Sequence, residues 1–213
     1  MRAFLRTSTL GFMLALTGLA VSTGAQAASS KRIQHSIDAE DLSHVEFEIS
    51  VAELEIEVYD GDTVEIDIDL RADRDWWFFS RGDVDDVDLT IREDGDSLEL
   101  ILDEDDVEQD WRVRLPVHMA VSMEMGVGEI DIEGFNNNLA LELGVGAVRV
   151  AVEGEDFDIV HVSTGVGDSS IRGFDRGPDN ERSFVGADSY YRGEGKFEVV
   201  IEVGVGDASV VRR

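Results

Sequence analysis

The sequence predicts an all-β protein built as a short, single-domain β-solenoid, a stack of coils with about 18–21 residues each. A Gly-Val-Gly triplet that recurs at nearly even spacing is the first observation behind this prediction. The second is that apolar and polar residues alternate on both sides of each triplet, which is the period of a half-buried strand. The third is the abundance of Gly, Asp and β-branched residues, which disfavours helix.

Residues 1–27 predict a cleavable export signal. Arg2 and Arg6 supply a positive start, residues 10–21 form an apolar run, and Ala25-Gln26-Ala27 is a small-residue motif for a signal peptidase. The apolar run has 12 residues, whereas roughly 20 are needed to cross a bilayer, so we expect cleavage after Ala27 rather than an uncleaved anchor. The remainder is then an exported protein, periplasmic or extracellular, that does not span the membrane.

The chain has 47 acidic and 18 basic residues and a formal net charge of −29 at pH 7. So large a negative charge disfavours nucleic acid and anionic lipid as partners. It leaves cations, basic proteins and neutral glycans as partner classes, or a surface whose acids only keep an exported protein in solution. The sequence contains no cysteine, which excludes disulfides, thiolate metal sites and lipid attachment at a cysteine.

The expected elements follow in chain order. Residues 28–42 are expected to be extended or disordered, and one β domain is expected to occupy residues 43–213. In the first half of this domain, Asp60-Gly61 and Asp94-Gly95 mark tight turns, and a larger insertion is expected at about residues 71–84. The runs with strand character cover residues 45–58, 64–70, 87–91 and 98–102.

The second half of the domain holds the repeats, whose triplets are separated by 18, 21 and 39 residues, the last gap being about two periods wide. Glycine suits a corner between two short strands because it adopts backbone angles that are barred to other residues. The corner glycines are Gly126, Gly128, Gly144, Gly146, Gly165, Gly167, Gly204 and Gly206. The central valines are expected to stack inside as a core ladder of Val127, Val145, Val166 and Val205. Residues 205–211 are β-rich, and we expect them at an open end of the stack.

The layout resembles the bacterial putative-adhesin β-solenoid family over most of residues 43–213. The resemblance rests on the opening strand and turn at residues 51–61, on Arg112-Val113-Arg114-Leu115-Pro116, and on the rungs that begin with Met125-Gly126-Val127-Gly128-Glu129-Ile130. Members usually carry Gly-Ser-Gly-Asp-Ile at the corner, where this chain has valine in place of serine. The resemblance implies an exported or envelope protein of uncharacterised function, and it supplies no catalytic residue.

Outward residues of stacked coils should align in ladders about 4.8 Å apart. The repeats align Glu124 with Glu142 and then with Ser163, which brings like charges together. We therefore expect weak stabilisation by Ca²⁺, with a solvated acidic face as the alternative, and no other cofactor or metal site. Two further ladders are expected, one of Glu129, Ala147, Asp168 and Asp207 and one, with compensated charge, of Asp131, Arg149 and Ser170.

An aromatic cluster lies within the expected insertion and consists of Trp76, Trp77, Phe78 and Phe79. Neighbouring residues of a strand point to opposite faces, so the four rings cannot all share one face. The cluster either plugs an open end of the solenoid or offers a platform for sugar rings or a protein partner.

No residue pattern predicts an enzyme. The sequence has neither a Gly-x-Ser-x-Gly elbow nor a phosphate-binding loop, and its four histidines lack zinc-ligand spacing. We expect a non-enzymatic, adhesin-like envelope or extracellular binding protein whose partner is an unknown protein or glycan. The alternatives are a structural or regulatory cell-envelope subunit that binds another envelope protein and, third, a carbohydrate-active enzyme that uses paired carboxylates.

Overall fold

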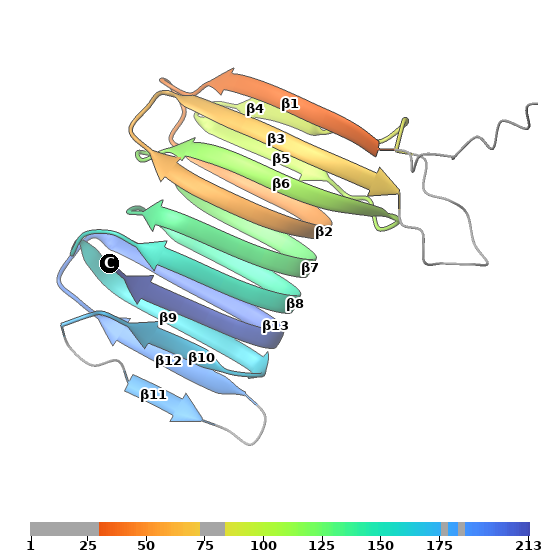
Figure 1. Ribbon diagram of the computed structural model, residues 1–213. Helices are drawn as coiled ribbons and strands as arrows, with labels where there is room; N and C mark the ends of the chain where they lie inside the picture. The colour runs from red at the N-terminus through yellow and green to blue at the C-terminus, as the bar shows by residue number, and fades with distance from the viewer. Residues whose placement is uncertain (1–29, 73–83, 176–178, 183–185) are drawn as a thin grey trace, which may run out of the picture.

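The computed structural model describes residues 30–72, 84–175, 179–182 and 186–213. Within these ranges the chain is all-β and contains no helix, which confirms the all-β part of the predicted fold class. Thirteen strands form one sheet whose path runs from β1 to β11 without closing (Figure 1). They are β1 (Ser30–Asp38), β2 (His44–Tyr59), β3 (Thr63–Ala72), β4 (Thr90–Asp94), β5 (Ser97–Leu102), β6 (Val107–Pro116), β7 (Ala120–Phe135), β8 (Leu139–Val152), β9 (Phe157–Val166), β10 (Ser169–Arg172), β11 (Asp179–Arg182), β12 (Ala187–Arg192) and β13 (Phe197–Arg212).

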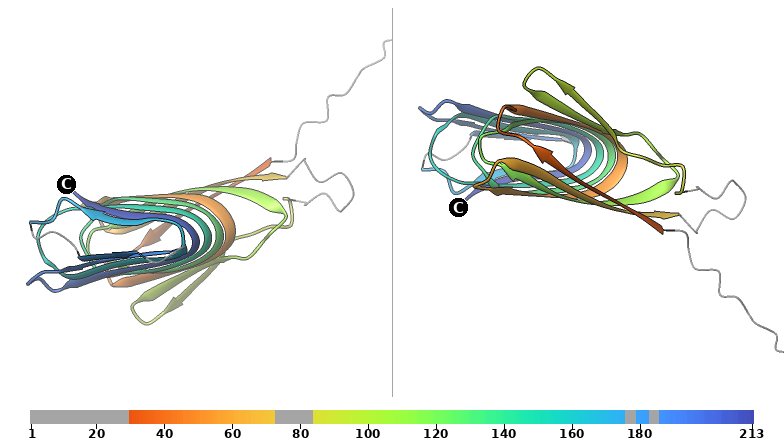
Figure 2. Two further views of the ribbon diagram at one scale, coloured as in Figure 1. Left: turned by 90° about the horizontal axis from the view of Figure 1, so that it is seen from below. Right: turned by 90° about the horizontal axis from the view of Figure 1, so that it is seen from above.

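The long strands are bent, and their bends lie on top of one another. Figure 2 shows β2, β7, β8 and β13 end-on as nested U shapes, each contributing one arm to each of two layers. Two pairs of shorter strands follow the same course. β5 and β6 pair in parallel with the first and second halves of β2, and β9 and β10 do the same with β13. The repeating unit is therefore a two-armed strand of about 16 residues with a bend at its centre.

The order of these units in space differs from their order in the chain. β2 lies between β5/β6 and β7, and β13 lies between β8 and β9/β10. The expectation that residues 205–211 form an open end is therefore wrong. Both sides of β13 are paired with neighbouring strands over this stretch, so its backbone groups are already satisfied. Stacking in register holds between parallel neighbours: Val121 pairs with Leu139, and Leu139 with Val199.

Antiparallel strands cover both ends of the parallel stack. At one end β3 pairs with β6, β1 pairs with β3, and β4 pairs with β5; at the other, β12 pairs with β9 and β11 with β12. Such cover reduces the unpaired edges that lead to aggregation. Residues 28–42 were expected to be extended or disordered, and Ser30–Asp38 of this segment is an extended strand. It pairs with β3 along its whole length, and Ile33 is buried beside its register partner Ile68.

The core fills the space between the two arms of the U. Alternate residues of each arm face inward, so the pairs Phe47 and Leu100, and Leu141 and Ile201, are fully buried. Trp111 is the largest buried side chain, packing edge-to-face on Phe47 with ring centroids 6.4 Å apart. Its indole nitrogen donates to Oε1 of the buried Gln109 at 3.0 Å, which satisfies the polar edge of the ring.

Candidate binding groove at the bend

Gly-Val-Gly triplets form the bends of β7, β8 and β13 and the junction between β9 and β10. The second glycine of each triplet has a backbone conformation that L side chains rarely adopt, with φ of 156° at Gly128, 147° at Gly146, 137° at Gly167 and 141° at Gly206. A Cβ on Gly146 would lie 1.8 Å from the carbonyl oxygen of Gly128 in the neighbouring strand. These glycines are thus required by both the backbone angle and the close approach of adjacent bends.

The valine of each triplet faces solvent, so the predicted core ladder is wrong. Val127, Val145, Val166 and Val205 are 46–48% exposed. Met125 and Ile130 are both buried although they are five positions apart, and strict alternation would require an even spacing. The bend therefore breaks the alternation of inward and outward side chains and turns the triplet outward. We call the aligned residues the valine column: Val51, Val127, Val145, Val205 and Val166, in spatial order.

The first glycines of the triplets stack into a surface of bare backbone. A Cβ on Gly144 would lie 2.5 Å from the carbonyl oxygen of Gly126, and one on Gly204 would lie 2.6 Å from that of Gly144. No side chain fits at these positions without moving the next strand. We call Gly126, Gly144, Gly204 and Gly165 the glycine floor. Ser50 occupies this position in β2, where β5 ends at Leu102 and leaves room for its hydroxyl to donate to Asp103 Oδ1.

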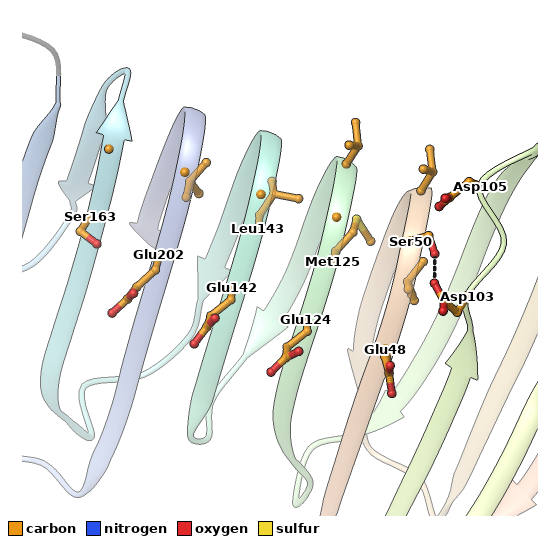
Figure 3. Close-up of a pocket in the computed structure, with 18 residues that line it drawn as sticks. Glu48, Ser50, Asp103, Asp105, Glu124, Met125, Glu142, Leu143, Ser163 and Glu202 are labelled. Atoms are coloured by element: carbon orange, nitrogen blue, oxygen red, sulfur yellow. Dashed lines mark hydrogen bonds between the residues drawn. The ribbon is translucent and has the colours of Figure 1, made fainter.

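A column of glutamates borders the glycine floor on the side away from the valines. Glu48, Glu124, Glu142 and Glu202 occupy equivalent register positions on β2, β7, β8 and β13, and Ser163 follows on β9 (Figure 3). We call the four glutamates the glutamate column. The sequence alignment brought together Glu124, Glu142 and Ser163 but missed Glu48 and Glu202. Glu202 could have been found, because it precedes Gly204 by two residues as Glu124 precedes Gly126.

The glycine floor and the glutamate column line an open groove of about 760 Å³, together with Val51 of β2 and Val127 of β7. Asp103 and Asp105 stand at its β5 end, and Ser163 at its β9 end. A glutamate and the valine of the same strand are three residues apart, so the backbone of the two columns lies at most about 10 Å apart. One wall of the groove is thus charged and its floor is peptide backbone. The valine column lies beyond the floor, and Val51 and Val127 are its members in the groove lining.

The glutamate column has no cationic neighbour among the residues that the structure describes, unlike the opposite arm. There Arg149 lies 3.7 Å from Asp131, and Arg112 lies 3.9 Å from Glu55. The two other expected ladders lie on this arm. Glu129, Ala147 and Asp207 are paired in register, with Asp207 Oδ1 accepting from the backbone N–H of Asp168 at 3.0 Å. Asp131 pairs with Arg149, but Ser209 stands between Arg149 and Ser170.

Arginines also compensate the acids at the β1 end of this arm. Arg32 donates to Asp69 through Nε at 2.8 Å and Nη2 at 2.7 Å, and Arg112 Nη1 adds a third bond at 3.3 Å. The hydrogen bond from Arg32, followed by that from Arg112, lowers the pKa of Asp69 below its ordinary value. Arg114 lies between Glu57 and Glu65, and its hydrogen bond to Glu65 raises the pKa of its guanidinium.

The other candidates from the sequence do not join the groove. In the part of the chain that the structure describes, no three His, Cys, Asp or Glu side chains are grouped to hold a metal ion. His161 Nε2 lies 3.0 Å from Asp188 Oδ2, outside the groove lining. Trp76, Trp77, Phe78 and Phe79 lie outside the described residues, as does the export signal. No helix within the described ranges is long and apolar enough to cross a bilayer.

Comparison with known proteins gives a fold and no family. No family model matches the sequence, and no curated protein matches it. A putative lipid binding protein from Parabacteroides distasonis gives a TM-score of 0.30 at 11% identity, covering 87% of this chain and 98% of its own. A putative adhesin from Bacteroides fragilis gives 0.27 at 9% identity, covering 86% and 98%. A putative cell adhesion protein from Clostridium sporogenes gives 0.52 at 14% identity, over 87% of this chain and all of that one, so the two share a fold.

Proposed function

We propose that this protein is a non-enzymatic, adhesin-like binding protein that holds its ligand along the groove at the bend. The exposure of the valine column is the observation that carries the proposal. Other large apolar side chains of the described strands are buried or partly buried, and among the described residues the one further exposed example is Val117, at 41% in the turn after β6. Burying a valine side chain is worth roughly 1.5 kcal/mol, so four half-exposed valines in a row leave a favourable contact surface in water.

Strand propensity alone does not account for valine at this position. Threonine has the same branching at Cβ and the same preference for extended backbone, and it would leave the bend hydrated. Serine stands there in the family that the sequence resembles, which shows that an apolar residue is not needed to make such a corner. The methyl groups are thus the property that this chain adds, and a partner is what would use them.

The shape of the groove favours recognition over catalysis. It is open along its length, and four of its carboxylates are equivalent glutamates set in a row rather than different groups converging on one point. Stacked strands give an extended, rigid surface, which suits binding to a long ligand. We class the stack of bent strands as a short β-solenoid, and the fold that it shares with a putative cell adhesion protein is compatible with an adhesin-like role.

The protein is proposed to act outside the cytoplasm. Residues 1–27 have the charge, apolar run and cleavage motif of an export signal, and the chain carries no cysteine that would need a reducing compartment. The excess of acids on the groove side favours a cationic partner among those outside the cell.

A binding isotherm on intact cells and on envelope preparations tests this function. The labelled wild-type protein is compared with the triple variant Val127→Thr, Val145→Thr and Val205→Thr, and with Trp76→Ala/Trp77→Ala. We expect the valine variant to lose at least about tenfold in affinity, since three apolar contacts are removed. The proposal fails if that variant binds like wild type, and binding lost only in the tryptophan variant would move the site to the aromatic cluster.

A further inference from the structure

We infer that the occupant of the groove is a basic amphipathic α-helix of a partner protein. This inference rests on the proposed function and specifies its ligand. It follows from the cross-section of the groove, from the repeat along it and from the charge around it, each of which excludes a different alternative.

The cross-section fits a helix with one apolar and one basic face. The glutamate column borders the glycine floor on one side and the valine column borders it on the other, at most about 10 Å away along the backbone. An α-helix with its side chains is about 10–12 Å across, so a helix lying on the glycine floor is wide enough to contact both columns at once. Its apolar face then meets Val127 and its neighbours, while lysine or arginine side chains reach Glu124 and its neighbours.

The repeat along the groove fits a helix better than an extended peptide. Neighbouring strands place their glutamates about 4.8 Å apart, and a helix presents one face again every 5.4 Å. Same-face residues of an extended peptide repeat every 6.6–6.8 Å or so, which falls out of step with the glutamates after two strands. From β2 to β9 the groove spans four strand intervals, about 19 Å, which corresponds to roughly 13 helical residues.

The surrounding charge makes the partner basic and disfavours a second copy of this chain. Glu53, Glu129 and Asp207 lie on the far side of the valine column, so carboxylates flank the valines on both sides. A copy of the same face would bring glutamates against glutamates, which repel. Long basic side chains satisfy both requirements because their methylene stems cover apolar surface while their charged ends reach the carboxylates.

Two synthetic peptides of about 18 residues with identical composition test the inference, since shorter helices are marginal in water. In one, leucine and lysine occupy opposite faces of a helix; in the other they alternate, which gives the period of a strand. Fluorescence anisotropy of the labelled peptides against the full protein measures affinity, and circular dichroism of the complex measures helix formation. Spermine serves as a small competitor that carries charge without an apolar face.

Three double variants locate the binding site. We expect Glu124→Gln/Glu142→Gln and Val127→Thr/Val145→Thr each to weaken the helical peptide by about 3- to 10-fold. The control Glu40→Gln/Glu93→Gln removes the same charge at two exposed positions away from the groove and should change affinity by less than about twofold. Melting curves of all three verify that they are folded.

The outcomes separate this inference from the function on which it rests. Three results would each overturn the inference of a helical ligand. They are tighter binding of the alternating peptide, equal losses of affinity in all three variants, and full displacement of the helical peptide by spermine at equal charge concentration. Should the envelope assay still depend on the valine column in that case, the groove remains the binding surface and only its occupant changes. Failure of both assays removes the proposed function itself.

Discussion

Glu142 of β8 lies directly beside Glu202 of β13, although the whole of β9 to β12 separates them in the chain. Glu124 occupies the other side of Glu142, so this carboxylate has a like charge on both flanks. Directly opposed like charges destabilise a sheet by roughly 0.2–1 kcal/mol per pair. The column therefore lowers the stability of the folded protein. Glu124 and Glu142 contribute most to this loss, since each has a glutamate on both flanks.

Neutralising Glu142 should stabilise the protein. We expect Glu142→Gln to raise the free energy of unfolding by roughly 0.5–1 kcal/mol at low ionic strength, because the amide keeps the shape and removes two repulsions. Urea unfolding measures the change, with Glu93→Gln on the exposed strand β4 as the matched control. A Glu142→Gln protein that is less stable than wild type would show that the carboxylate has a favourable partner.

Salt should narrow the difference between wild type and Glu142→Gln. Screening acts over about 10 Å at 0.1 M and about 3 Å at 1 M ionic strength, so repulsion between exposed neighbours weakens as salt is added.

Ca²⁺ is expected to stabilise the wild type slightly more than NaCl of equal ionic strength, raising the melting temperature by about 2 °C. The Glu124→Gln/Glu142→Gln variant should lose that extra increment. Identical melting curves of wild type in the two salts would contradict the calcium effect.

The second glycine of a triplet should be far less replaceable than a turn glycine. In Gly146→Ala the new Cβ meets the Gly128 carbonyl oxygen at 1.8 Å, and φ is 147°. We expect destabilisation of at least about 3 kcal/mol, or failure to fold. Gly95→Ala is the control, because Gly95 has φ of 65° but no atom within 4 Å of its Cβ position. We therefore expect this variant to lose only about 1 kcal/mol of stability. Comparable losses in the two variants would mean that the bends do not touch.

The sequence predicts the strands and their register well because both follow from local alternation. Leu139, Leu141 and Leu143 pair with Val199, Ile201 and Val203 as the repeats align them. The order of strands was not predictable in this way. Equivalent repeats carry the same apolar pattern. The local sequence therefore does not show whether the strand beside β8 is β9, which follows it in the chain, or β13, which lies at the end of the chain. The repeat itself indicates that Glu202 belongs to the column, and only its place directly beside Glu142 depends on the strand order.

The orientation of the valines could have been predicted by counting. Met125 and Ile130 both belong to the inward set, and an odd separation requires the alternation to break between them. The expectation of a valine core assumed that side chains keep alternating between inward and outward positions through a corner. Gly128, with φ of 156°, allows this alternation to break. The groove is a direct consequence of this break, since it turns Val127 outward beside Gly126.

The arginine network on the second arm predicts a defined loss of stability in acid. Because the pKa of Asp69 is lowered in the folded state, its contribution is fully present above the unfolded value near 3.9 and disappears as pH falls through the folded one. We expect wild type to be more stable than Asp69→Asn at neutral pH and the difference to shrink below about pH 4. Urea unfolding across pH checks this. A difference that is unchanged at pH 3 would mean that the Arg32 contact does not depend on the charge of Asp69.

Two valines three residues apart test the outward turn of the bend directly. Val145 is 47% exposed and Val148 is 3% exposed, although both follow Gly144 in β8. Val145→Thr should change the free energy of unfolding by no more than about 0.5 kcal/mol, because the added hydroxyl stays in water. Val148→Thr buries the same hydroxyl among apolar neighbours and should cost about 1–3 kcal/mol. Urea denaturation of the two variants compares identical chemical changes in one strand. A Val145→Thr loss as large as that of Val148→Thr would place the valine column back in the core and leave the groove without its apolar border.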